Sequence, residues 1–168
     1  MRRTRRLRGV LALLVGAAVL TGLTGCDLFA PQETLHNGET SDGVSGTTGA
    51  IQVANAVLIT SNGAAGNLVA TLVNTGGDAQ EVRIQLGSSS GSTQTQTVKA
   101  KAAQATQLGQ PGGDIVLFRG VDLAPGSLES MYFQAGNSSG VQLDVPVLTG
   151  AQEPYHTLTP EKVSPTAG

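Results

Sequence analysis

Apolar and polar residues alternate with a period of two along most of the chain after residue 50, a pattern typical of half-buried β-strands. Glu81–Leu86 alternates most regularly, and Ile51–Thr60 does so with Asn55 interrupting the pattern. Asn67–Thr75 is apolar on both faces, which predicts a central strand. No stretch after Cys26 keeps a 3.6-residue apolar period, so the sequence predicts an all-β domain.

Short clusters of Gly, Pro, Asn, Asp and Ser separate these segments and predict turns. Thr93–Ala100 has few apolar residues and is expected to be an exposed edge strand. Seven or eight closely spaced strands are typical of a β-sandwich or a small barrel, and residues 50–158 suffice for one. The predicted strands are Ile51–Thr60, Asn67–Thr75, Glu81–Leu86, Thr93–Ala100, Gln104–Leu108, Ile115–Phe118, Leu128–Gln134 and Val141–Val147.

The inward positions of these strands give the expected core of an antiparallel sandwich. In the last strand, four aliphatic residues at every second position form an inward stripe. The predicted core residues are Val53, Val57, Leu72, Val82, Ile84, Leu117, Phe118, Phe133, Leu143 and Val145.

The N-terminus has a different pattern. Met1–Arg8 is strongly cationic and Gly9–Leu23 is apolar and uncharged. A membrane-spanning helix needs about 20 apolar residues, so this shorter run is interpreted as a secretory signal peptide, residues 1–25. The four residues that end it, Leu23, Thr24, Gly25 and Cys26, resemble the lipobox of bacterial lipoproteins. In such proteins the signal peptidase cuts before the Cys, whose sulfur carries diacylglycerol.

Cys26 is the only Cys in the chain. A lone Cys in an exported protein has no intramolecular partner, and lipidation accounts for it better than a spare thiol does. The sequence therefore predicts a cell-membrane lipoprotein on the outer, extracytoplasmic face. By resemblance to lipoprotein sorting rules, Asp27 favours the inner membrane of a double-membrane bacterium. Residues 26–49 are rich in Gly and polar residues and are expected to form a flexible tether, with a loose tail at residues 159–168.

Loss of the signal peptide changes the charge balance. Five of the ten basic residues lie in residues 1–25, which leaves five against twelve acidic residues, a net charge near −7. That charge argues against a nucleic-acid partner and against a polybasic hold on anionic lipid. The expected partners are the membrane, through the lipid, and a protein or other component of the cell envelope.

Two segments match the nucleophile-elbow pattern G-x-S-x-G, namely Gly87–Gly91 and Gly136–Gly140. That chemistry needs a strand-to-helix turn and a nearby His. No helix is predicted after either match, and His36 and His156 lie in the tether and near the tail. The acidic residues form no calcium-loop motif. We therefore expect a protein that is not an enzyme and has no catalytic residues, and interpret the acidic residues as solvated surface.

Residues 50–148 resemble the periplasmic copper chaperone family called PCu(A)C, which has a cupredoxin-like β-sandwich. The resemblance implies a Greek-key fold, cupredoxin-like or immunoglobulin-like. The segments that carry it are Pro111–Gly113, Ile115–Val121, Leu128–Phe133, Ala135–Gly136 and Val141–Val147, the last including Val145-Pro146-Val147.

The copper ligands of that family are missing. The family places His and Met two residues apart after the Pro-Gly-Gly turn, where this chain has Ile115 and Leu117. Its earlier His and Met would fall between Ser88 and Lys99, which contains neither. Apolar side chains do not replace such ligands, so we expect no metal and no cofactor, and expect both residues to deepen the core.

Three functions stay open from the sequence. The leading one is a lipid-anchored, non-enzymatic binding domain. The alternative is a divergent copper chaperone that uses Met131 and His156, although one Met on a strand is far more often core than ligand. An enzyme is the third.

Overall fold

The computed structural model describes residues 42–87, 91, 93–151 and 153–164. The chain divides into two units, residues 1–38 and 39–168, and all described residues belong to the second. This unit is all-β, as predicted. The lipobox, the signal peptide and His36 lie outside the described residues.

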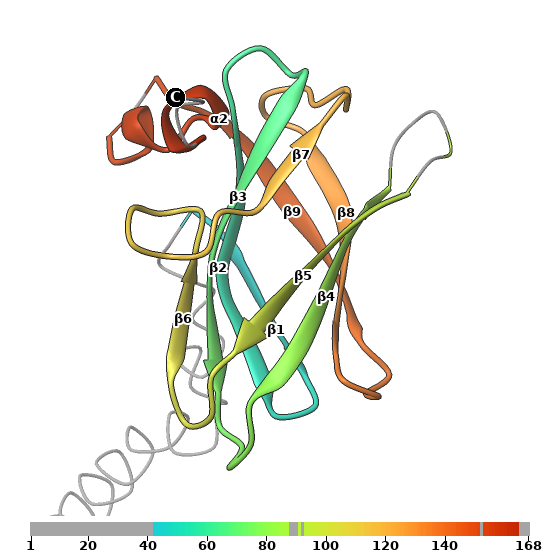
Figure 1. Ribbon diagram of the computed structural model, residues 1–168. Coiled ribbons are helices and arrows are strands. Elements are labelled where there is room, and N and C mark those ends of the chain that lie inside the picture. Colours follow the sequence, from blue (N-terminus) through green and yellow to red (C-terminus); the bar gives the residue numbers. More distant parts are fainter. Residues whose placement is uncertain (1–41, 88–90, 92, 152, 165–168) are drawn as a thin grey trace, which may run out of the picture. The chain divides into compact units, whose positions relative to one another are not determined.

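Nine strands and two short helices make up the described part of the chain (Figure 1). The helices are the 3-10 helix η2 (Tyr155–Thr157) and α2 (Pro160–Val163). The strands are β1 (Val44–Thr48), β2 (Ile51–Thr60), β3 (Ala65–Asn74), β4 (Gln80–Gly87), β5 (Thr93–Ala100), β6 (Ala105–Leu108), β7 (Leu117–Arg119), β8 (Leu128–Ala135) and β9 (Val141–Thr149).

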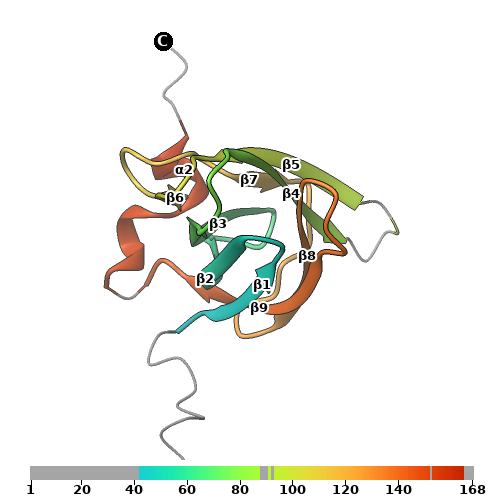
Figure 2. The ribbon, with the colours of Figure 1, turned by 90° about the horizontal axis from the view of Figure 1, so that it is seen from below.

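The strands form one mixed sheet that curls so that its two halves face each other as the layers of a sandwich do (Figure 2). The order is β5-β4-β8-β9-β2-β3-β6, with β1 paired to β2 and β7 paired to β3. β9 joins the halves, because its first part pairs with β8 and its end, Val147–Thr149, pairs with Leu58–Thr60 of β2.

The expectation of a purely antiparallel sheet was wrong at this junction, because β2 and β9 run parallel. The reason lies in the neighbouring strands. β1 pairs with the first part of β2 and leaves the end of that edge free for β9. The direction of β9 is set by its hairpin with β8, and it arrives parallel to β2.

The main core lies between the two halves and contains most of the predicted residues. Two predicted members are less buried than expected: Leu143 is half-buried and packs against the core, and Leu117 is half-buried on β7. The predicted residues with no exposed surface are Val53, Val57, Leu72, Val82, Ile84, Phe118, Phe133 and Val145.

At Asn55, the alternation of inward and outward side chains along β2 changes phase. Its φ is +51°, and the pairing with β3 shifts register between Ala54 and Val57. A bulge of this kind inserts an extra residue, so the alternation changes phase. Val53 therefore faces the main core, whereas Val57 lies in a second apolar cluster on the outer face of β2 and β3.

The tether prediction, residues 26–49, was wrong for its last residues, because Val44–Thr48 form β1. This strand carries little apolar surface, and the contacts of Asn55 hold its start. Gly43 N donates to Asn55 Oδ1 at 3.0 Å and Asn55 N donates to Ser45 Oγ at 3.1 Å. Pairing with β2 then supplies the partners for its backbone.

The loose-tail prediction, residues 159–168, was also wrong for its first part. Thr159 and Pro160 are buried and α2 follows directly. Residues 165–168 lie outside the described part.

Candidate functional site

The curled sheet ends in β5 on one side and in β6 on the other, and β7 pairs with β3 as β6 does. We call the boundary between β5 and these two strands the seam. On one part of this seam, Gln94 and Gln96 of β5 reach the backbone of β7. Gln94 Oε1 accepts a hydrogen bond from Arg119 N at 3.3 Å, and Gln94 Nε2 donates one to Arg119 O at 2.6 Å. Gln96 Nε2 donates to Leu117 O at 3.0 Å. The two amides thereby satisfy part of the free edge of β7.

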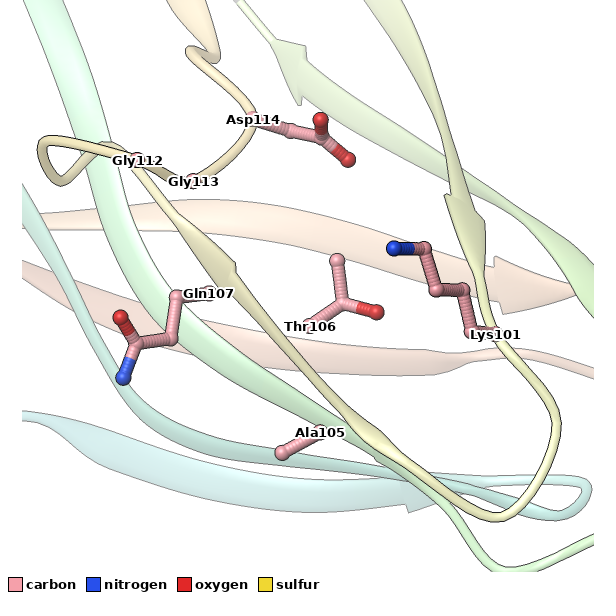
Figure 3. A pocket seen from close by; sticks show the side chains of 7 residues that line it. All are labelled: Lys101, Ala105, Thr106, Gln107, Gly112, Gly113 and Asp114. Atoms are coloured by element: carbon pink, nitrogen blue, oxygen red, sulfur yellow. The ribbon is translucent and has the colours of Figure 1, made fainter.

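The other part of the seam holds a pocket of about 280 Å³ between the end of β5, β6 and the loop after β6. Figure 3 shows the amino group of Lys101 pointing into the space between Asp114 and Thr106. The lining residues are Lys101, Ala105, Thr106, Gln107, Gly112, Gly113 and Asp114. We call this space the seam pocket.

Backbone hydrogen bonds fix the position of Asp114. Its N donates to Gln107 O at 3.0 Å and its O accepts from Gly109 N at 2.8 Å. Gly113 must be glycine, because a Cβ there would collide with the backbone oxygen of Gln107. The Pro-Gly-Gly turn at residues 111–113 therefore serves to bring the loop close to β6.

The seam pocket offers binding groups of both charges. Lys101 contributes an ammonium group and Asp114 a carboxylate, and the buried hydroxyl of Thr106 has no hydrogen-bond partner. An unpaired buried hydroxyl costs free energy, so a ligand or water that reached it would be stabilised. The pocket is suited to a small polar group, and its described lining contains no nucleophile paired with a base.

Ile115 and Leu117, the positions where the resembling family has His and Met, do not deepen the core, so that expectation was wrong. Ile115 is 38 % exposed and Leu117 is half-buried. Val116 and Phe118 take the inward positions instead, with 2 % and 0 % exposure. Ile115–Phe118 contains no polar residue, so the sequence does not indicate which alternate positions of this run face the core.

Met131 and His156, the residues of the copper alternative, are not brought together. Met131 has no exposed surface and lies in the main core. His156 lies on η2, where its Nδ1 is 2.9 Å from Glu153 Oε2 and its side chain is about half exposed. Among the described residues, no group of three or more His, Cys, Asp or Glu side chains could hold a metal ion.

The second serine motif, Gly136–Gly140, is a β-hairpin turn and not a strand-to-helix elbow. Ser138 Oγ is hydrogen-bonded to Thr48 Oγ1 at 2.7 Å, and Gln134 Nε2 donates to Ser138 O at 2.9 Å. These bonds tie the hairpin to β1. Of the first serine motif, three residues, 88–90, lie outside the described part of the chain.

The predicted lipidation residues, Leu23, Thr24, Gly25 and Cys26, lie outside the described residues. No helix in the described ranges is both long enough and apolar enough to cross a membrane. No protein-family model and no curated protein matches the chain.

Proposed function

We propose that this protein is a bacterial lipoprotein whose all-β domain is a non-enzymatic binding module at the outer face of the cell membrane. The observation that carries the proposal is the N-terminal sequence, in which a cationic start and a short apolar run lead to Leu23-Thr24-Gly25-Cys26. Fifteen residues, Asp27–Ser41, separate the lipidated Cys from the first described residue, Asp42. The resemblance to a cupredoxin-like copper chaperone belongs to the same proposal, as a shared ancestry of the fold.

The geometry supports binding more than catalysis. The seam pocket presents a cation and a carboxylate, a pair that can hold a polar group of an envelope component, and the buried Thr106 hydroxyl beside it has no partner. Among its described lining residues, no nucleophile is hydrogen-bonded to a base.

Replacement of Cys26 by Ala tests the anchoring half of the proposal. We expect the wild-type chain in the membrane fraction, labelled by a fatty-acid probe, and the Cys26→Ala chain unlabelled and not processed before residue 26. A variant that is still processed and still held in the membrane would overturn the proposal.

The binding half is tested by crosslinking in intact cells with the seam-pocket variants Lys101→Ala and Asp114→Asn. We expect crosslinked products of the wild type to be lost in both variants and kept in Lys99→Ala, a control that removes an exposed Lys of β5 outside the pocket lining. Equal crosslinking of all four proteins would show that the seam pocket is not the binding site.

A further inference from the structure

The outer face of β2 and β3 carries an apolar cluster that the last part of the chain covers. Val57, Ile59 and Val69 project from this face and are at most 4 % exposed. Tyr155 and Leu158 pack on them and are 7 % exposed each. We call residues 155–164 the C-terminal latch. In Figure 1 it lies beside β3.

The latch makes no strand pairing with the sheet. The backbone–backbone hydrogen bonds of its described residues run within the latch, as from Leu158 N to Tyr155 O at 2.9 Å and from Lys162 N to Thr159 O at 2.9 Å. Its attachment therefore depends on side chains, whereas each strand is also held by a ladder of backbone bonds.

One buried, one partly buried and two exposed polar contacts attach the latch. Asn67 of β3, which is fully buried, donates from Nδ2 to Leu158 O at 2.8 Å. The remaining contacts are Tyr155 Oη to Asp42 Oδ2 at 2.9 Å, Ser61 Oγ to Glu161 Oε2 at 2.7 Å and Arg119 Nη2 to Ser164 Oγ at 2.8 Å. Contacts between exposed side chains contribute little to stability.

The surface beside the latch is hollowed. An open depression of about 580 Å³ lies at the ends of β2 and β9, lined among others by Thr60, Thr149, Thr159 and Lys162. A segment without a ladder of backbone bonds to its neighbours is expected to open at a lower free energy than the strands beside it.

We propose that the C-terminal latch is a strap that opens as a unit without unfolding the sheet, and that its opening uncovers the apolar face of Val57, Ile59 and Val69. In the closed state the latch itself occupies this face. Its bond to Asp42 places the strap at the point where the chain enters the domain from its N-terminal side. The proposal does not depend on the lipid anchor.

Amide hydrogen exchange on residues 26–168 carrying Cys26→Ala is the first test. We expect the amides of Leu158, Lys162 and Val163 to exchange at least about tenfold faster than the paired amides of β2 and β3, because local opening needs less free energy than global unfolding. Exchange of latch and strands at one common rate would overturn the proposal.

A disulfide between Gly150→Cys and Thr159→Cys provides the second test in the same protein. A Cβ built at Gly150 would lie against Cγ2 of Thr159, so the side chains of the two Cys would lie next to each other. We expect oxidation to slow exchange of the latch amides at least about tenfold and to leave β4 and β5 unchanged.

The reduced and oxidised forms of this double Cys variant also report on the exposure of the apolar face. In dilute urea, the reduced protein should bind an apolar fluorescent dye and the oxidised protein should bind several-fold less. Equal dye binding by the reduced and oxidised proteins would contradict the proposal that the latch opens as a strap. So would amide exchange of the latch that does not change on oxidation. The Gly150→Cys single variant controls for the loss of the glycine.

Discussion

Asn55 determines which side chains of β2 face the core. Its left-handed φ of +51° and its side-chain contact with Gly43 N hold the bulge at which the strand changes phase. Asn adopts this conformation more readily than other residues with a Cβ. One residue therefore directs Val53 into the main core and Val57 under the latch.

Asn55→Ala and Asn55→Gly separate the two roles of this residue. Both lose the hydrogen bond to Gly43, but only Ala is strained by the positive φ. We expect Asn55→Ala to lower the free energy of unfolding by about 1–2 kcal/mol and Asn55→Gly by less. Urea unfolding followed by circular dichroism measures both. If Gly is the more destabilising of the two, strain at residue 55 is not the reason for the choice of Asn.

Phe133 is among the largest side chains with no exposed surface in the main core. Its truncation to Ala should lower the free energy of unfolding by about 3–5 kcal/mol, because it removes buried area and leaves a cavity. Ile115→Ala is the matched control, since Ile115 is 38 % exposed, and it should change stability much less. Equal losses in urea unfolding would show that the two sites are equally packed.

At the scale of the elements, the seam between β5 and β7 depends on glutamine amides. Gln96→Ala removes the donor to Leu117 O and should lower the free energy of unfolding by about 1 kcal/mol. Thr95→Ala, one residue earlier on the exposed face of β5, should have a smaller effect. Thermal unfolding of the two variants checks this prediction. A larger loss of stability in Thr95→Ala than in Gln96→Ala would contradict the role given to the Gln96 amide.

The latch should respond to high pH. Burial, and then the hydrogen bond and charge of Asp42, raise the pKa of Tyr155 above its usual value near 10. The folded protein thus holds this proton more tightly than the unfolded chain, so the contribution is complete below pH 10 and is lost as the pH rises through the raised pKa. We expect latch amide protection to weaken above about pH 10 in the wild type. In Tyr155→Phe, which lacks the ionising group, this alkaline loss should be absent; the same loss in both proteins would exclude Tyr155 as its source.

Across the described part of the molecule, strands with β propensity between turn residues were predictable from the sequence, and the features that depend on distant contacts were not. Ile51–Thr60 and Thr93–Ala100 were predicted with the bounds the structure has. β1 was missed because its five residues include one aliphatic side chain and its backbone partners lie on β2. The seam pocket was missed because Lys101 and Asp114 are thirteen residues apart in the chain and line one pocket only in the folded sheet.

The lipid anchor stays a prediction, and it rests on a local signal, a short apolar run that ends at Leu23-Thr24-Gly25-Cys26. The latch has no such signal. Tyr155 and Leu158 are three residues apart, but no longer run of apolar residues at helical spacing surrounds them. Their burial depends on the bulge at Asn55 that turns Val57 and Ile59 outward.

Mass spectrometry of the protein extracted from membranes of a bacterial host tests the central claim most directly. The account predicts a mature chain that begins at Cys26, with the N-terminal peptide heavier by a diacylglyceryl group on the sulfur. A chain that begins at any other residue, or a Cys26 that carries no lipid, would contradict it.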